Sequence, residues 1–187
     1  MWSGLKGAGL SQTLRSVLSG HKPSGANVTP VTGNAIASAT ATPVTATSSS
    51  IANDALGYEG HAYRYGGAPG PDGSQPWDCS SFVNWVLGHD LGFTLPGSSA
   101  PGYSGQSHGP TTLSYIGWSG AETVGHTAAA AQPGDLVVGV THMGIATGGG
   151  NYISAHDVAE RTSVKPISTF PDPLFYVRRI IIGTSRG

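Results

Sequence analysis

One cysteine and seven histidines supply the candidate reactive side chains of this 187-residue chain. Cys79 directly follows Asp78, a favoured N-cap residue, so we expect it in the first turn of a helix. The unpaired N–H groups and dipole of a helix start favour negative charge and lower the pKa of a thiol there. The same N–H groups can bind the oxyanion of a tetrahedral intermediate. The position therefore predicts a nucleophile, although a buried structural cysteine can also begin a helix.

A thiol nucleophile needs a base, and His142 is the best candidate. Histidine can take the thiol proton and later give it to the leaving amine near neutral pH. His142 follows an apolar segment launched by the turn at 133–135, and it opens the segment His142–Thr147, where a polar ring is out of place. A hydrogen-bonded core histidine is the alternative. Surface or turn roles are predicted for His21, His61, His89, His108 and His126.

The composition argues against several other kinds of site. Only 10% of the residues are charged and the formal net charge is -1, so no basic field exists to hold nucleic acid or an anionic membrane surface. A single cysteine rules out an internal disulfide framework and multi-cysteine zinc sites, and the histidines lack paired ligand spacing. We therefore predict no metal and no nucleic-acid partner. No segment approaches the roughly 20 apolar residues of a membrane span.

Residues 1–50 are predicted to lie outside the folded domain, which we place at 51–187. The first twenty residues form a weak amphipathic pattern, without the apolar run of about 7–15 residues that a secretory signal needs. Residues 19–50 are rich in Ser, Thr, Ala, Pro and Gly, so ordering them would bury little apolar surface. The segment is either a flexible arm or a docking segment that orders against a larger assembly.

The elements that must position Cys79 and His142 are predicted between residues 51 and 182. A short helix at 51–57, an aromatic segment at 61–65 and a Gly/Pro loop at 66–77 come first. The nucleophile helix follows at 79–87, ended by Gly88, and then a long loop at 96–120 that walls a cleft. Strands are predicted at 136–140, 142–147, 151–156 and 174–182. This order, helices before strands, indicates an α+β fold.

Four motifs, in order, resemble the NlpC-type cysteine peptidases, a papain-like family that cuts stem peptides of bacterial peptidoglycan. They are Tyr63-Arg64-Tyr65-Gly66-Gly67, Asp78-Cys79-Ser80-Ser81-Phe82-Val83, Pro133-Gly134-Asp135-Leu136, and His142-Met143-Gly144-Ile145 followed by Gly148-Gly149-Gly150. The resemblance covers residues 51–182. It implies a nucleophile helix packed on an antiparallel sheet and a reactive pair of Cys79 and His142. It also implies that Tyr63, Asp78 and Ser80 lie beside the substrate.

Two positions depart from that family. Ser81 stands where a glycine is usual, which narrows the space behind the nucleophile helix. The polar residue that orients the base falls at Ser154 in an ungapped match. A three-residue turn at 148–150 would instead place His156 opposite His142, with Ser154 and His156 on one strand face. We favour His156 as the orienting residue that holds the productive tautomer; the alternative is that it ends the strand at the surface.

The resemblance implies hydrolysis of an amide bond in a stem peptide, after D-glutamate, through a thioester on Cys79 and without a metal or organic cofactor. An amidase or acyltransferase on the same fold is a second hypothesis, because a thioester accepts either water or another nucleophile. An inactive wall-binding or assembly module is a third. Ser154-Ala155 after an apolar pair is similar to bacteriophage tail-associated members. We therefore expect an extracellular protein, associated with the cell wall or a virion, whose partner is peptidoglycan.

Overall fold

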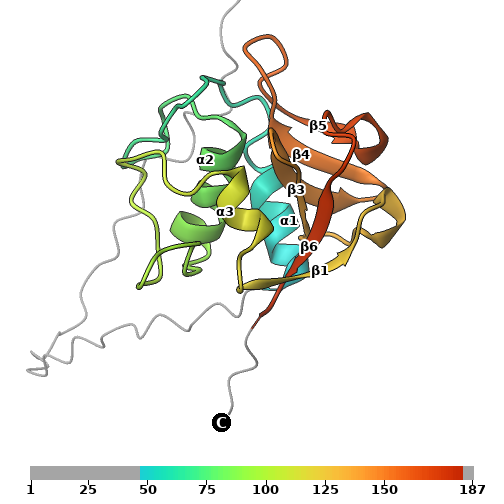
Figure 1. The fold of residues 1–187 in the computed structure, drawn as a ribbon. Helices are drawn as coiled ribbons and strands as arrows, with labels where there is room; N and C mark the ends of the chain where they lie inside the picture. Colours follow the sequence, from blue (N-terminus) through green and yellow to red (C-terminus); the bar gives the residue numbers. More distant parts are fainter. Residues whose placement is uncertain (1–46, 183–187) are drawn as a thin grey trace, which may run out of the picture. The chain divides into compact units, whose positions relative to one another are not determined.

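The computed structural model describes residues 47–182, and its helices precede most of its strands (Figure 1). The helical elements are α1 (Ser48–Leu56), α2 (Cys79–Asn84), the π-helix η2 (Trp85–Asp90), α3 (Thr112–Ile116) and the 3₁₀ turns η3 (Ala128–Ala130) and η4 (Ile167–Thr169). The strands are β1 (Ala121–Gly125), β2 (Leu136–Val138), β3 (Met143–Gly148), β4 (Asn151–Ala155), β5 (Thr162–Pro166) and β6 (Tyr176–Ile180). The N-terminal arm at residues 1–50, for which a flexible and a docking role were both left open, lies almost entirely outside the described residues.

All six strands form one antiparallel sheet in the order β1-β6-β2-β3-β4-β5. Strands β2, β3 and β4 are neighbours in sequence and in space, whereas β6 returns from the end of the chain to lie between β1 and β2. Helices α1 and α2 lie to one side of the sheet and pack against β3 (Figure 1). The predicted α+β fold, with the nucleophile helix on an antiparallel sheet, is confirmed.

Both faces of the central strands are buried. The helix-facing cluster includes Ile51, Ala55, Phe82, Val83, Leu136, Met143, Ile145 and Ile153. The opposite face carries a smaller cluster of Val137, Ala146, Tyr152, Ile167 and Phe170. Successive strand residues point to opposite faces, so a strand covered on both sides consists almost entirely of apolar residues. This explains why β2, β3 and β4 are recognisable in the sequence.

The hairpin between β3 and β4 places the candidate base beside its predicted neighbour. Ile145 pairs with Ile153, and this register continues to put His142 opposite His156. The turn differs from the prediction, because Gly148 still belongs to β3 and pairs with Asn151. The register shifts by one residue between Ala146 and Gly148, so the shorter turn still leaves Ile145 opposite Ile153.

The nucleophile helix does not end at Gly88, so that prediction was wrong. It continues as the π-helix η2 to Asp90. Gly88 is buried, and a Cβ atom there would lie 2.5 Å from the Cβ of Tyr103 and 3.0 Å from Leu95. The glycine is required because the chain at 95–103 packs directly against the helix backbone, and not because a helix stops there.

Two strands and one helix were missed by the sequence analysis. Strands β1 and β5 are the two edges of the sheet, and most of their side chains are exposed or only partly buried. Edge strands commonly carry Lys, Glu and Pro, which hide the apolar pattern of a strand. Helix α3 has only five residues and lies inside the predicted long loop.

Helix α1 begins with a capping box that reaches into the predicted arm. The hydroxyl of Thr47 accepts the Ser50 N–H at 3.1 Å, and the Ser50 hydroxyl accepts the Thr47 N–H at 2.9 Å. The helix then buries Ile51 and Ala55 completely. Helix α1 and its cap therefore begin a few residues before residue 51, where the sequence analysis placed the start of the domain.

We predict that deleting residues 1–46 leaves the melting temperature of the domain unchanged, whereas deleting residues 1–50 lowers it. The longer deletion removes the capping box and the first turn of α1, and loss of an N-cap costs about 1 kcal/mol. Thermal unfolding followed by circular dichroism compares the two truncations. Equal melting temperatures for both would show that the cap contributes nothing.

Candidate active site

Cys79 is the first residue of α2, and Asp78 caps the helix as predicted. One carboxylate oxygen of Asp78 accepts the N–H groups of Ser80 and Ser81 at 3.1 and 3.0 Å. The Ser81 hydroxyl in turn accepts the Asp78 N–H at 2.9 Å. The serine that departs from the family motif thus completes a capping box, which a glycine could not do. The cap fixes the backbone that carries the thiol.

The pKa of the Cys79 thiol is raised to about 12, so the predicted lowering was wrong. Burial is the largest cause, followed by the negative charge of Asp78. Backbone N–H groups of Met143 and Ser80 point at the sulfur and oppose the shift without reversing it. The resting nucleophile is therefore a protonated thiol, because burial and a nearby carboxylate both disfavour the thiolate.

His142 lies at the end of a tight turn that leads into β3. The Gly139 N–H donates to the His142 carbonyl at 2.8 Å and closes this turn. The carboxylate of Asp172 accepts the N–H groups of Thr141 and His142 at 2.9 and 3.1 Å, and the Thr141 hydroxyl at 2.6 Å. The N–H of Met143, the next residue, then points at the Cys79 sulfur. The fold thus brings Cys79 against the start of β3.

The imidazole of His142 is held by aromatic rings. It stacks on His156 with ring centroids 5.2 Å apart, and it packs against Phe170 at 5.5 Å and Tyr152 at 6.1 Å. Its Nε2 atom is buried, and no residue in the described part of the chain forms a hydrogen bond with it. Burial, followed by the charge of His156, lowers the pKa of His142 to about 4. At neutral pH the ring is uncharged and can accept a proton.

Neither of the two predicted orienting residues, His156 and Ser154, forms a hydrogen bond with the Nε2 atom of His142. The Nε2–H of His156 donates to the Ser163 carbonyl at 3.0 Å, and the Ser154 hydroxyl donates to the Met143 carbonyl at 2.6 Å. The predicted hydrogen bond from His156 was therefore wrong, although the two rings do lie together. Strand period and hairpin register correctly predicted that His156 lies beside His142. They did not predict that the Nε2 atom of His156 forms its hydrogen bond with Ser163 on β5.

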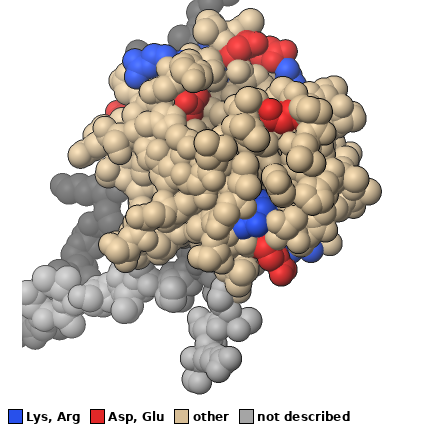
Figure 2. Space-filling model, viewed as in Figure 1, with Lys and Arg blue, Asp and Glu red and all other residues tan. Residues whose placement is uncertain are grey.

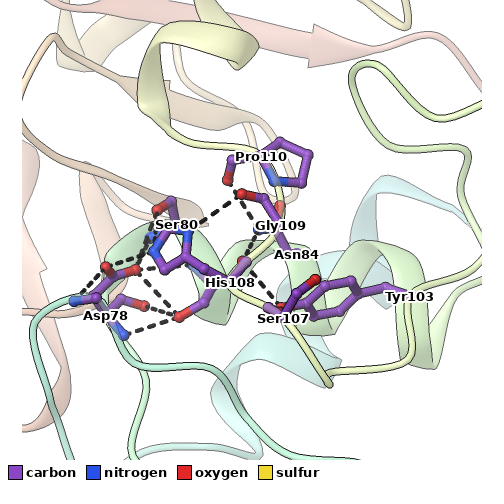
Figure 3. Close-up of polar contacts among 10 residues, drawn as sticks. Asp78, Ser80, Asn84, Tyr103, Ser107, His108, Gly109 and Pro110 are labelled. Carbon is purple, nitrogen blue, oxygen red and sulfur yellow. Dashed lines mark hydrogen bonds and ion pairs between the residues drawn. The ribbon is translucent and has the colours of Figure 1, made fainter.

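His108 joins the site, although the sequence analysis gave it only a surface or turn role. Its Nε2 atom lies 2.7 Å from a carboxylate oxygen of Asp78, which also accepts the Gly66 N–H at 3.1 Å (Figure 3). Its Nδ1 atom lies 3.2 Å from the carbonyl of Gly109. Both ring nitrogens of His108 thus face oxygen atoms of the chain. Thirty residues separate His108 from Asp78, and no local pattern marks the pair.

The nucleophile helix also fastens the loop that carries His108. The buried amide of Asn84 donates to the carbonyl groups of His108 and Pro110, both at 2.9 Å (Figure 3). Its amide oxygen accepts the Tyr115 hydroxyl at 2.7 Å. Both ends of α2 therefore bind the segment around residues 108–110, which fixes this segment relative to Cys79.

A cavity of about 650 Å³ opens beside Cys79. It is bounded by the start of α2, by the segment that includes His108, and by the turn at residues 140–141 just before His142. Part of the predicted long loop thus lines the cleft, as expected. Five of the ten lining residues carry a hydroxyl group: Tyr65, Ser80, Thr111, Thr112 and Thr141.

The three predicted substrate-binding residues occupy different places. Ser80 and Asp78 line the cavity, but the Asp78 carboxylate is already engaged by donors from its own chain. Tyr63 is not among the lining residues, and Tyr65 is. Burial is the largest cause of the raised pKa of the Tyr63 hydroxyl, followed by the charge that Cys79 would carry as a thiolate and by the charge of Asp78.

The surface around these elements carries little charge. Figure 2 shows a face made mostly of uncharged residues, with a few scattered acidic and basic side chains. Between residues 47 and 182, no group of three or more His, Cys, Asp or Glu side chains is arranged to hold a metal ion. None of the helices in that part of the chain is long and apolar enough to cross a membrane.

A helix that begins at a cysteine and packs on an antiparallel sheet, next to a strand directly preceded by a histidine, defines a papain-like α+β fold. The family model of the NlpC/P60 family matches residues 60–176. The chain therefore belongs to the NlpC/P60 family, which confirms the resemblance found in the sequence.

The chain is also similar to individual proteins. The probable endopeptidase p60 of Listeria seeligeri is 33% identical over 112 residues, which are 57% of this chain and 17% of the relative. The chain thus spans less than a fifth of that protein. The Resuscitation Promoting Factor Interacting protein RipA is 21% identical with a TM-score of 0.51, and the match covers 71% of this chain and 62% of RipA. The NlpC/p60 domain of the peptidoglycan hydrolase SagA is 28% identical, with a TM-score of 0.49 and coverage of 71% and 98%.

We predict that Asp78→Asn lowers the pKa of the Cys79 thiol. Asparagine is as good an N-cap as aspartate, so the helix start is kept while the negative charge is lost. The test is the rate of alkylation by iodoacetamide, measured across pH. In the wild type this rate should still be rising above pH 9, whereas in the variant it should level off at a lower pH. Asp90→Asn, at the other end of the helix, is the matched control. If Asp78→Asn leaves the profile unchanged, burial alone sets the thiol pKa.

Proposed function

We propose that this chain is a cysteine peptidase that hydrolyses amide bonds in the stem peptides of bacterial peptidoglycan. The observation that carries the proposal is the position of Cys79, which lies in the first turn of α2, against the start of β3 and in a cavity large enough for a peptide segment. Membership of the NlpC/P60 family supports the same chemistry. The printed name of the related probable endopeptidase p60 supports peptidase activity, and the resemblance of the four motifs implies peptidoglycan as the substrate class.

The proposed reaction starts from two neutral groups. His142 takes the Cys79 proton as the sulfur attacks the carbonyl carbon, since a thiol with a pKa near 12 does not ionise beforehand. The C–N bond of the tetrahedral intermediate breaks, and His142 gives the proton to the departing amine. Water then hydrolyses the thioester and regenerates the thiol. The Tyr63 hydroxyl is proposed to bind the oxyanion, because the family resemblance implies that Tyr63 lies beside the substrate.

The finer substrate assignment depends on the family resemblance. Cleavage after D-glutamate is the bond that the resemblance implies. The hydroxyl-rich cavity suits a substrate with many amide groups, because hydroxyls can both donate and accept hydrogen bonds. Ser80 is proposed to contact this substrate directly, and Asp78 to act through His108. Peptidoglycan as partner places the protein outside the cell or at the cell wall; association with a phage particle stays a prediction.

One observation favours a second candidate function, an inactive module that binds the cell wall. The Nε2 atom of His142 lacks an acceptor within the described residues, and the Cys79 thiol is protonated at rest. A site that had lost catalysis would tolerate both features. Two other enzymes could use the same thioester, and their products distinguish them. An amidase would cut a different amide bond, and an acyltransferase would pass the acyl group to a nucleophile other than water.

We predict that Cys79→Ala abolishes cleavage of purified peptidoglycan and leaves the fold intact. The substitution removes the nucleophile and only one sulfur atom of volume. Mass spectrometry of the released fragments measures cleavage, and circular dichroism measures folding. Fragments that end at the D-glutamyl carboxylate are expected from the wild type. Undiminished release by the folded variant would refute the mechanism, and a wild type that binds peptidoglycan without releasing fragments would identify a binding module.

We predict that His156→Phe retains much more activity than His156→Ala. The His156 ring supports His142 by stacking, and phenylalanine can replace a stacked ring but not a hydrogen bond. The alanine variant should lose turnover by roughly tenfold or more, because a misplaced base transfers protons poorly. Stem-peptide turnover is measured for both variants and for Ser154→Ala. Equal losses in the two His156 variants would instead indicate a polar orienting role.

A further inference from the structure

We propose that Asp172 is the positioning residue of the base His142, and that it acts through the main chain of the 139–142 turn while its charge stabilises the cationic ring. The inference rests on the proposed function, because it takes His142 to be the base of that reaction. Asp172 lies between η4 and β6, thirty residues from His142 and outside every motif identified in the sequence.

The contacts of Asp172 show that its carboxylate is built into the turn. One oxygen accepts the N–H groups of Thr141 and His142 at 2.9 and 3.1 Å, and the other accepts the Thr141 hydroxyl at 2.6 Å. A Cβ atom on Gly139 would lie 2.0 Å from the carboxylate, so only glycine fits at that position. The backbone of His142 is therefore fixed by a side chain from a distant segment.

The same segment also contacts the imidazole. Phe170 precedes Asp172 by two residues and packs on the His142 ring at 5.5 Å. The Nε2 atom of His142 has no hydrogen-bond partner among residues 47–182, so no side chain there acts as a conventional third member of a triad. The orientation of the ring instead comes from its aromatic neighbours, and the orientation of its backbone comes from Asp172.

The reaction creates a positive charge at this place. When the S–H bond of Cys79 breaks and an N–H bond forms on His142, the ring becomes an imidazolium. The charged groups around it come from several elements: His156, which directly follows β4, and Lys165 on β5 disfavour the cation, whereas Asp172 and, more weakly, Asp78 favour it. Of these two carboxylates, Asp78 is paired with His108, and Asp172 makes the larger favourable contribution.

Asp172→Asn separates geometry from charge. The amide oxygen can accept the two backbone N–H groups, and the amide nitrogen can donate to the Thr141 hydroxyl, so every contact of the turn can be kept. Only the negative charge is lost. Asp172→Ala removes both the contacts and the charge. Glu122→Gln, an exposed carboxylate on β1, is the matched control for the loss of one charge.

Two measurements test the proposal. The first is an NMR titration of the His142 ring in the Cys79→Ala background, which requires no turnover. The second is the pH dependence of kcat and KM for a soluble stem peptide. We expect Asp172→Asn to lower the pKa of His142 and to reduce kcat by roughly tenfold with little change in KM and melting temperature. Glu122→Gln should change none of these quantities.

The outcomes separate this proposal from the one it rests on. An unchanged His142 pKa in Asp172→Asn overturns the charge role, whatever the activity. A lowered pKa with an unchanged kcat overturns the catalytic role. Failure of the proposed function would appear instead as cleavage by Cys79→Ala, while the NMR titration would still report on Asp172. A greater loss of melting temperature in Asp172→Ala than in Asp172→Asn is expected from the lost contacts.

Discussion

The carboxylate of Asp78 holds together three segments that are far apart in sequence: the turn at Gly66, the start of α2 and the loop at His108. Burying a carboxylate is costly, and burial by itself would raise its pKa. Hydrogen bonds from Ser81 and His108 outweigh that effect and hold the pKa of Asp78 below its ordinary value. The stabilisation is therefore present above the ordinary pKa and is lost only as the pH falls through the lowered one. Without a side-chain acceptor at this position, the cap, the cavity and the position of Cys79 would change together.

The same charge has a cost for the nucleophile. Asp78 stabilises the backbone around Cys79 and at the same time disfavours the thiolate. Burial likewise keeps His142 neutral. A neutral thiol beside a neutral imidazole is cheaper to bury than an ion pair, which must recover the cost of removing two charges from water. The resting site is thus stable in its uncharged form, and charge has to develop during the reaction.

Main-chain contacts position both reactive groups. Cys79 is fixed by the capping box of its helix, and His142 is fixed by a turn whose N–H groups bind Asp172. Side-chain hydrogen bonds to the imidazole are replaced by packing against the second face of the sheet. These hydrogen bonds hold the backbone of His142, so no further polar side chain has to bond to its imidazole. It also makes the segment between η4 and β6 part of the site.

The sequence by itself determined the features that depend on neighbours along the chain. The cap before Cys79, the apolar pattern of the central strands and the hairpin that pairs His142 with its stacking partner are all local, and they were predicted. Only the tertiary structure decided that His108 and Asp172 join the site, because each reaches its partner across about thirty residues. It also decided the direction of the thiol pKa shift, since burial and a nearby charge act through space and outweighed the effect of the helix start. The edge strands were missed for a related reason: polar residues on an exposed edge carry no apolar pattern, and only pairing with the rest of the sheet identifies them as strands.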